Sequence, residues 1–142
     1  MNTIREQIIQ ALVSRVGATR MLEQYDSRDL PLTVIAEGDD VAAETPYGMT
    51  AVVMPVTVAR AIALTGNKDD GWYNEANNEL GRLIDDIYSA GDDTLSGLCQ
   101  GIDYASGSVE LLTDGSNGAA VQVSLNVRYQ FRHGNPFENT ED

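Results

Sequence analysis

The sequence predicts an α+β fold in which an antiparallel or mixed β-sheet has two amphipathic helices packed on one face. Three observations support this fold class. A long segment near the C-terminus alternates between apolar and polar residues, two other segments have apolar residues at helical spacing, and the remaining apolar segments are separated by connections rich in turn-forming residues. At 142 residues the chain fits one domain, residues 1–142, with an irregular acidic tail from about residue 133.

The segment Ala119–Arg132 alternates strictly between apolar and polar residues from Val121 onward. Roughly 12 residues at about 3.4 Å each give a strand of about 40 Å, much longer than the usual strand of about 5–6 residues. We therefore expect a principal strand with one buried face. Its other face stays polar, in water or against another subunit, and consists of Gln122, Ser124, Asn126, Arg128, Gln130 and Arg132.

The N-terminal part of the chain predicts one helix and two short strands. The helix is expected from about Thr3 to Val16, because Thr3 and Glu6 match a capping box, in which the Thr side chain accepts from the Glu amide and the Glu side chain bonds back to the Thr amide. Residues 21–29 are polar and turn-like. Strands are expected at Leu32–Glu37 and at residues 41–44, joined by a tight turn at residues 38–40.

The segment Met49–Leu64 has apolar residues at alternate positions, many of them valine, and predicts a second long strand. Pro55 indicates a bulge or an edge location, because proline has no amide hydrogen to donate. Arg60 lies among the apolar positions of this strand. We expect it either to mark the point where the strand leaves the core or to extend its guanidinium to solvent along an apolar stem.

The second half of the chain predicts one helix and three strands. Apolar residues at helical spacing indicate an amphipathic helix at Trp72–Ser89. Two strands follow at Leu98–Ala105 and Ser108–Thr113. The connection Asp114–Gly118 contains both Asp-Gly and Asn-Gly and predicts a hairpin to the long C-terminal strand.

Charge excludes some classes of partner. The chain has 9 Lys and Arg against 22 Asp and Glu, a formal net charge of −13. Such a surface repels phosphate backbones, so sequence-specific binding of DNA or RNA is not expected. The sequence has no signal peptide and no apolar run near the roughly 18 residues that span a bilayer, so we expect a cytoplasmic protein without a membrane partner.

Residues suited to catalysis are nearly absent. We interpret the single cysteine, Cys99, as a small buried hydrophobic residue and the single histidine, His133, as a solvated or hydrogen-bonded loop residue. The sequence contains no nucleophile elbow, dinucleotide-binding glycine motif or P-loop, and residues 67–78 fail the spacing of an EF-hand. We therefore expect no enzyme, no cofactor and no metal site.

The chain resembles the tail terminator and tail completion proteins of long-tailed bacteriophages and prophages. The likeness covers most of the length and lies in a small acidic chain with a capped first helix, a central valine-rich strand, a second helix and a closing strand that ends in Gly-Asn-Pro. The corresponding segments are Asn2–Ile9, Ala51–Val58, Asn78–Ile84 and Val127–Pro136. Phage neck joining proteins share this layout.

The resemblance implies a mechanical role. Such proteins form rings, commonly of six subunits, that bind the last ring of the tail tube, stop its polymerisation and present a surface to the head connector, while DNA passes through without specific binding. The protein would then lie in the host cytoplasm during assembly and in the virion tail afterwards. The family has no catalytic residues to transfer. Our hypothesis is that the Thr65–Gly71 loop and the segment around Arg128–Pro136 make ring or tube contacts, through Lys68, Asp69, Asp70, Arg128, Arg132 and His133.

A different class of function is also open. An acidic binding module, such as an immunity or chaperone protein, would use the same surface charge to neutralise a basic partner. Self-association into a ring would favour the terminator, whereas a monomer that captures a basic protein would favour the binding module.

Overall fold

The structure is a computed structural model of the chain and describes residues 2–20, 31–43, 48–65, 70–111 and 117–139. Two helices and six strands are present in these ranges, together with a short 3₁₀ turn. In chain order the elements are α1 (Ile4–Val16), β1 (Thr19–Arg20), β2 (Leu32–Glu37), β3 (Val41–Ala42), β4 (Met49–Ala63), α2 (Asp70–Ile87), η2 (Ser89–Gly91), β5 (Gly101–Leu111) and β6 (Gly118–Arg132).

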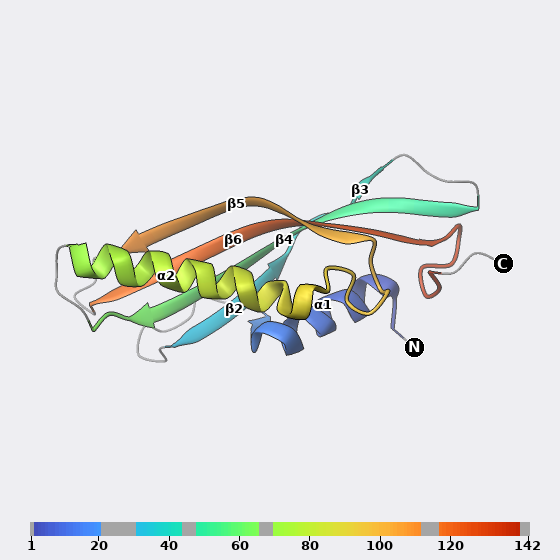
Figure 1. The fold of residues 1–142 in the computed structure, drawn as a ribbon. Helices are drawn as coiled ribbons and strands as arrows, with labels where there is room; N and C mark the ends of the chain where they lie inside the picture. Colours follow the sequence, from blue (N-terminus) through green and yellow to red (C-terminus); the bar gives the residue numbers. More distant parts are fainter. Residues whose placement is uncertain (1, 21–30, 44–47, 66–69, 112–116, 140–142) are drawn as a thin grey trace.

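The strands form one mixed, mostly antiparallel sheet in the order β1-β2-β4-β6-β5, and β3 pairs with β4 beyond the end of β2. Only β1 and β2 run parallel. The centre of the sheet is the pair β4 and β6, each of 15 residues, which stay in register from Met49 opposite Arg132 to Ala63 opposite Gly118. The molecule is accordingly long, with these strands running along its length (Figure 1).

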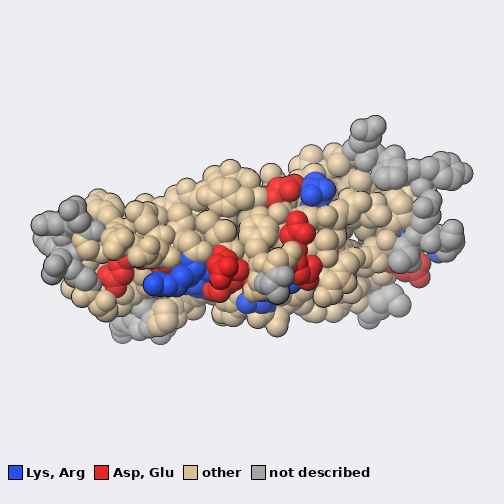
Figure 2. All heavy atoms as spheres, in the orientation of Figure 1, with Lys and Arg blue, Asp and Glu red and all other residues tan. Residues whose placement is uncertain are grey.

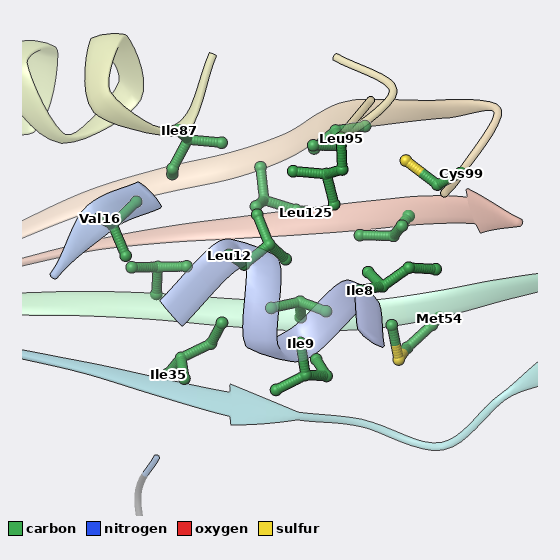
Figure 3. Close-up of a cluster of buried hydrophobic side chains, with 14 of the residues drawn as sticks. Ile8, Ile9, Leu12, Val16, Ile35, Met54, Ile87, Leu95, Cys99 and Leu125 are labelled. Atoms are coloured by element: carbon green, nitrogen blue, oxygen red, sulfur yellow. The ribbon is translucent and has the colours of Figure 1, made fainter. Parts of the chain in front are cut away.

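Both helices cover the same face of the sheet, as the sequence predicts, and α2 lies over β6 and β5 (Figure 1). The core lies between the helices and the inward residues of the strands. Ile8, Ile9 and Leu12 of α1 meet Ile87 from α2 and Leu125 from β6 there (Figure 3). Each of these side chains is at most 1% exposed. Burial of one apolar stripe from each helix is what fixes both helices on the sheet.

The start of α1 confirms half of the predicted capping box. Thr3 Oγ1 accepts a hydrogen bond from the Glu6 amide at 3.1 Å, as expected for a residue just before a helix. The predicted return bond is wrong. The Glu6 carboxylate instead accepts from Arg20 of β1 at 2.8 and 2.9 Å, because a guanidinium within reach gives a charge-assisted bond.

Pro55 lies where β4 changes partner. Glu37 at the end of β2 pairs with Val56, and Val41 at the start of β3 pairs with Val53, so three residues, 38–40, face two, 54 and 55. The Gly38 amide donates to the Pro55 carbonyl at 2.7 Å. The irregularity predicted near Pro55 is therefore in the strands beside β4, while the ladder between β4 and β6 continues unbroken.

Two predicted features of the sheet are wrong in detail. The two strands expected at Leu98–Ala105 and Ser108–Thr113 are one strand, β5, with a register shift at Ala105, and residues 98–100 precede it in a turn. The short strand β1 was not predicted at all. The turn-like segment at residues 21–29 and most of the hairpin connection at Asp114–Gly118 lie outside the described residues.

The chain after β6 forms turns that fold back on the domain. The Pro136 carbonyl accepts from the Ile4 amide at 2.9 Å, at the start of α1, and Asn139 Nδ2 donates to the Gly97 carbonyl at 3.1 Å. The described part of the tail, residues 133–139, is thus hydrogen-bonded both to the start of the first helix and to the turn before β5.

Candidate interaction surface

The face of the sheet opposite the helices is the main candidate for function, and we call it the outer face. Along β6 it presents the residues predicted from the alternation: Gln122, Ser124, Asn126, Arg128, Gln130 and Arg132. The residues between them on β6, such as Val123 and Val127, are fully buried under the helices. No described helix covers the outer face.

Arg128 stands over the edge of the sheet on this outer face. Its Nε donates to Asp103 Oδ2 of β5 at 2.7 Å, and the pKa of Arg128 is raised by the hydrogen bond and charge of Asp103. A Cβ atom at Gly101, the residue opposite Arg128, would collide with the guanidinium. Glycine at position 101 therefore lets the arginine extend across β5 toward the edge of the sheet.

Arg132 and His133 lie together at the end of β6. Arg132 forms an ion pair with Glu138 at 3.3 Å, and its amide donates to the carbonyl of the same residue. The His133 ring lies 3.2 Å from Thr50 Oγ1, and its amide donates to the Gly48 carbonyl at 3.0 Å. His133 is exposed in a turn, which agrees with its interpretation as a solvated or hydrogen-bonded loop residue.

The predicted contact residues do not form one site. Lys68 and Asp69 lie outside the described residues, and Asp70 is the first residue of α2, where its side chain is not described. The start of α2 lies at one end of the long sheet and the end of β6 at the other (Figure 1). The 14 steps between the ends of β6 correspond to about 45 Å, so the two regions are separate surfaces.

The outer edge of β5 is a candidate contact surface that the sequence pattern does not predict. β5 is the last strand of the sheet, and among the described residues no strand pairs with its far side. Six consecutive residues, 103–108, are exposed. The strand contains neither Lys nor Pro, two residues that commonly protect edges, although the bulge at Ala105 is itself a protective feature. Because the sequence predicts two short strands in place of β5, it does not predict so long an edge.

All seven arginines in the described part of the chain form ion pairs with carboxylates of the same chain. They are Arg5, Arg15, Arg20, Arg60, Arg82, Arg128 and Arg132. From the helix side, basic groups are seen next to acidic ones (Figure 2). Within those ranges no arginine is left without a carboxylate partner, so the acidic groups behind the net charge of −13 dominate what the surface offers to other molecules.

Cys99 lies in the core and is 6% exposed. Burial raises the pKa of its thiol to about 11, so the thiol is protonated near neutral pH and is a poor nucleophile. Its interpretation as a small buried hydrophobic residue agrees with this position. Within the described ranges no three His, Cys, Asp or Glu side chains are grouped to hold a metal ion. Across the same residues no helix has the length and apolar character needed to cross a membrane.

Comparisons with known proteins identify no family for the chain. No family model matches it, and no curated protein matches it. Among solved structures, a chain from the virion of a native gene transfer agent particle is similar, with a TM-score of 0.38 and 8% sequence identity over 90% of this chain and 92% of that chain. A similarity this distant does not bear on function.

Proposed function

We propose that this protein is a ring-forming assembly protein that caps the tail tube of a phage-like particle. In this role it stops tube polymerisation and offers a surface to the head connector. The single observation that best supports the proposal is the exposed edge of β5 beside an outer face that no described helix covers. The specific role as a tail terminator rests on the sequence resemblance. A role as a phage neck joining protein is the alternative with the same layout.

An exposed strand edge favours assembly because its unpaired amide and carbonyl groups are satisfied when another strand is added. In a closed ring each subunit uses two different patches, one for each neighbour. The β5 edge would be one patch. The opposite edge of the sheet, at β1, or the region of Lys68, Asp69 and the start of α2 at Asp70 would contribute the other. The acidic surface would let DNA pass through the ring without adhering to it.

The test places a lysine on the edge without changing the core. Ser106 is exposed on the outer face of β5, so Ser106→Lys places a charged side chain beside the backbone groups with which an incoming strand would pair. Asn78→Lys, on the exposed surface of α2, adds the same charge away from the edge. The assembly state is measured by sedimentation and electron microscopy with and without the tail-tube protein, and folding by urea denaturation.

We expect wild type and Asn78→Lys to form rings on tube ends and to give tails of defined length. Ser106→Lys should keep its urea midpoint but fail to assemble, leaving tubes of variable length. Normal rings from Ser106→Lys would show that the β5 edge is not the contact. A wild-type protein that neither self-associates nor alters tube length would overturn the assembly role itself.

An acidic binding module is the second candidate, favoured by the pairing of every described arginine within the chain. A basic partner would then meet carboxylates without competing arginines. Under this function the protein stays monomeric, and binding weakens steeply as salt is added, because the attraction is between exposed charges.

A further inference from the structure

A small hollow crosses the outer face of the sheet, transverse to the strands. One ladder row runs through it from Val34 on β2 to Ala59 on β4, Gln122 on β6 and Ser108 on β5. The hollow has a volume of about 190 Å³. Drug-sized ligands and cofactors occupy about 300–1,000 Å³, so this hollow suits a single side chain.

The lining is mostly apolar on β2 and β4, where Thr57 is the polar member, and more polar toward β5. Val34, Ala59 and Ala120 form an apolar floor on β2, β4 and β6. Ser108 and Glu110 line the hollow from β5 and Gln122 lines it from β6, and all three are exposed. An occupant that matches this lining has a long apolar stem and a polar head.

The charge at the polar end selects the sign of that head. Glu110 is exposed and has no ion-pair partner among the described residues. It lies at the edge of the sheet opposite Ala120, so no neighbouring side chain in that row competes for its carboxylate. A cationic head would gain a charge-assisted hydrogen bond to Glu110, whereas an anionic head would be repelled.

We propose that this hollow binds one arginine or lysine side chain from a basic protein partner. The aliphatic stem lies on the floor at Val34, Ala59 and Ala120, and the charged head is held by Glu110 with Ser108 and Gln122 beside it. This mode uses the tendency of long cationic side chains to bury their stems and keep their heads in polar surroundings. The described arginines of a second copy are already in ion pairs, which favours a different protein as the donor.

The proposal is tested with nine-residue Gly/Ser peptides that carry one central residue, either Arg, Leu or Glu. The methyl signals of Ala59 and Ala120 are followed by NMR in the full chain during titration. We expect the Arg peptide to give saturable shifts with a Kd in the millimolar range, typical of a single side-chain anchor. The Leu peptide should bind at least about fivefold more weakly, and the Glu peptide should give no saturable shift.

Two variants and one control separate the charge from the shape of the hollow. Glu110→Gln keeps the shape and should weaken the Arg peptide about fivefold or more. Ala59→Leu fills the floor and should abolish the saturable shift of Ala120 while the chain remains folded by circular dichroism. Asp85→Asn removes one exposed charge from α2, on the helix side of the sheet, and should leave the Kd unchanged.

Equal binding of the Leu and Arg peptides would overturn the assignment of a cationic occupant. The absence of saturable shifts in the wild type, or an unchanged Kd in Glu110→Gln, would overturn the site. Because the titration is read in the single chain, its result does not depend on whether the protein forms rings.

Discussion

The guanidinium of Arg60, on the core-facing side of β4, lies 3.1 Å from the Glu79 carboxylate of α2. Its other nitrogens donate to Asp86 Oδ2 at 2.9 Å and to Thr33 Oγ1 at 2.9 Å. The Arg60 side chain is only 12% exposed. Of the two alternatives expected from the sequence, extension to solvent is wrong, because the helix above this position supplies acceptors for the charge within the protein.

Loss of the Arg60 guanidinium should destabilise the protein by about 2 kcal/mol, because the Glu79 side chain, 13% exposed, would lose a partner while largely buried. Urea denaturation of Arg60→Met measures this cost while the apolar stem is kept. Arg82 is the other arginine paired with Glu79, and its side chain is 64% exposed. Arg82→Met should therefore destabilise the protein by less than about 0.5 kcal/mol. Equal costs for the two variants would contradict the role given to burial.

Asp92 should make the stability depend on pH in the acid range. The amide of Thr94, the Thr94 hydroxyl, the Ser96 amide and Arg15 all donate to its carboxylate and lower its pKa from 3.8 to about 2. Because the folded-state pKa is below the unfolded one, the stabilisation is complete above about pH 4 and is lost as the pH falls toward 2.

Urea midpoints between pH 2 and 7 provide the measurement for Asp92. The wild type should lose stability across this acid window, and Asp92→Asn should lose less over the same range because its amide does not titrate. Asp85→Asn, at an exposed position of α2, should follow the wild-type curve. A wild-type midpoint that does not change from pH 4 to pH 2 would rule out this linkage.

The helices and the long strands could be predicted because one face of each is buried and the other is not. Burial imposes a period of 3.6 on α1 and α2 and a period of 2 on β6, and both periods are visible in the sequence. The polar outer positions of β6, including Arg128 and Arg132, were predicted for the same reason. This signal specifies which face a residue occupies, but not what lies beside it.

The β5 strand was divided in the prediction because its middle lacks a strand signal. Ala105, Ser106 and Gly107 have low β-propensity, and the bulge at Ala105 breaks the alternation. In the structure the Tyr104 side chain lies over Gly107, where a Cβ atom would collide with its hydroxyl. The ladder to β6, a contact distant in sequence, keeps this segment extended.

The hollow on the outer face could not be predicted from the sequence. Val34, Ala59, Ala120 and Ser108 come from four strands, and small residues at single positions of separate strands have no local pattern. The register that aligns them is set by pairing between distant segments. Gly101 likewise acquires its role only from Arg128, which lies opposite it in the ladder.

Replacement of Ser96 by glycine should increase the stability of the protein. Leu95 and Ser96 have φ values of 52° and 59°, in the left-handed region that costs a residue with a side chain about 1–2 kcal/mol. After the entropy gained by the unfolded chain is subtracted, Ser96→Gly should stabilise the protein by about 0.5 kcal/mol. Asn117→Gly, at φ 53°, should gain less because asparagine tolerates this region. A destabilised Ser96→Gly in thermal denaturation would contradict the strain assigned here.

Cys99 should react slowly while the protein is folded. With a pKa of about 11 the thiolate is only about one part in a thousand at pH 8, and the side chain is 6% exposed. Labelling by a disulfide reagent at pH 8 should therefore be at least about a hundredfold slower than in denaturing urea. Rapid stoichiometric labelling of the native protein would show that the turn before β5 opens readily.

Reversal of charge at Arg128 and Arg132 tests the contact surface at this end of β6. Arg128→Glu removes a hydrogen-bond donor at the sheet edge and places a second carboxylate next to Asp103. The side chains of Arg128 and Asp103 are both about half exposed. We expect a small loss of stability, below about 1 kcal/mol, but a clear loss of ring assembly and of uniform tail length by electron microscopy. Asp103→Asn removes the same intrachain ion pair while keeping the arginine, so it should assemble normally. If the double variant Arg128→Glu/Arg132→Glu still formed rings and tails of normal length, these two residues would not belong to the assembly contact.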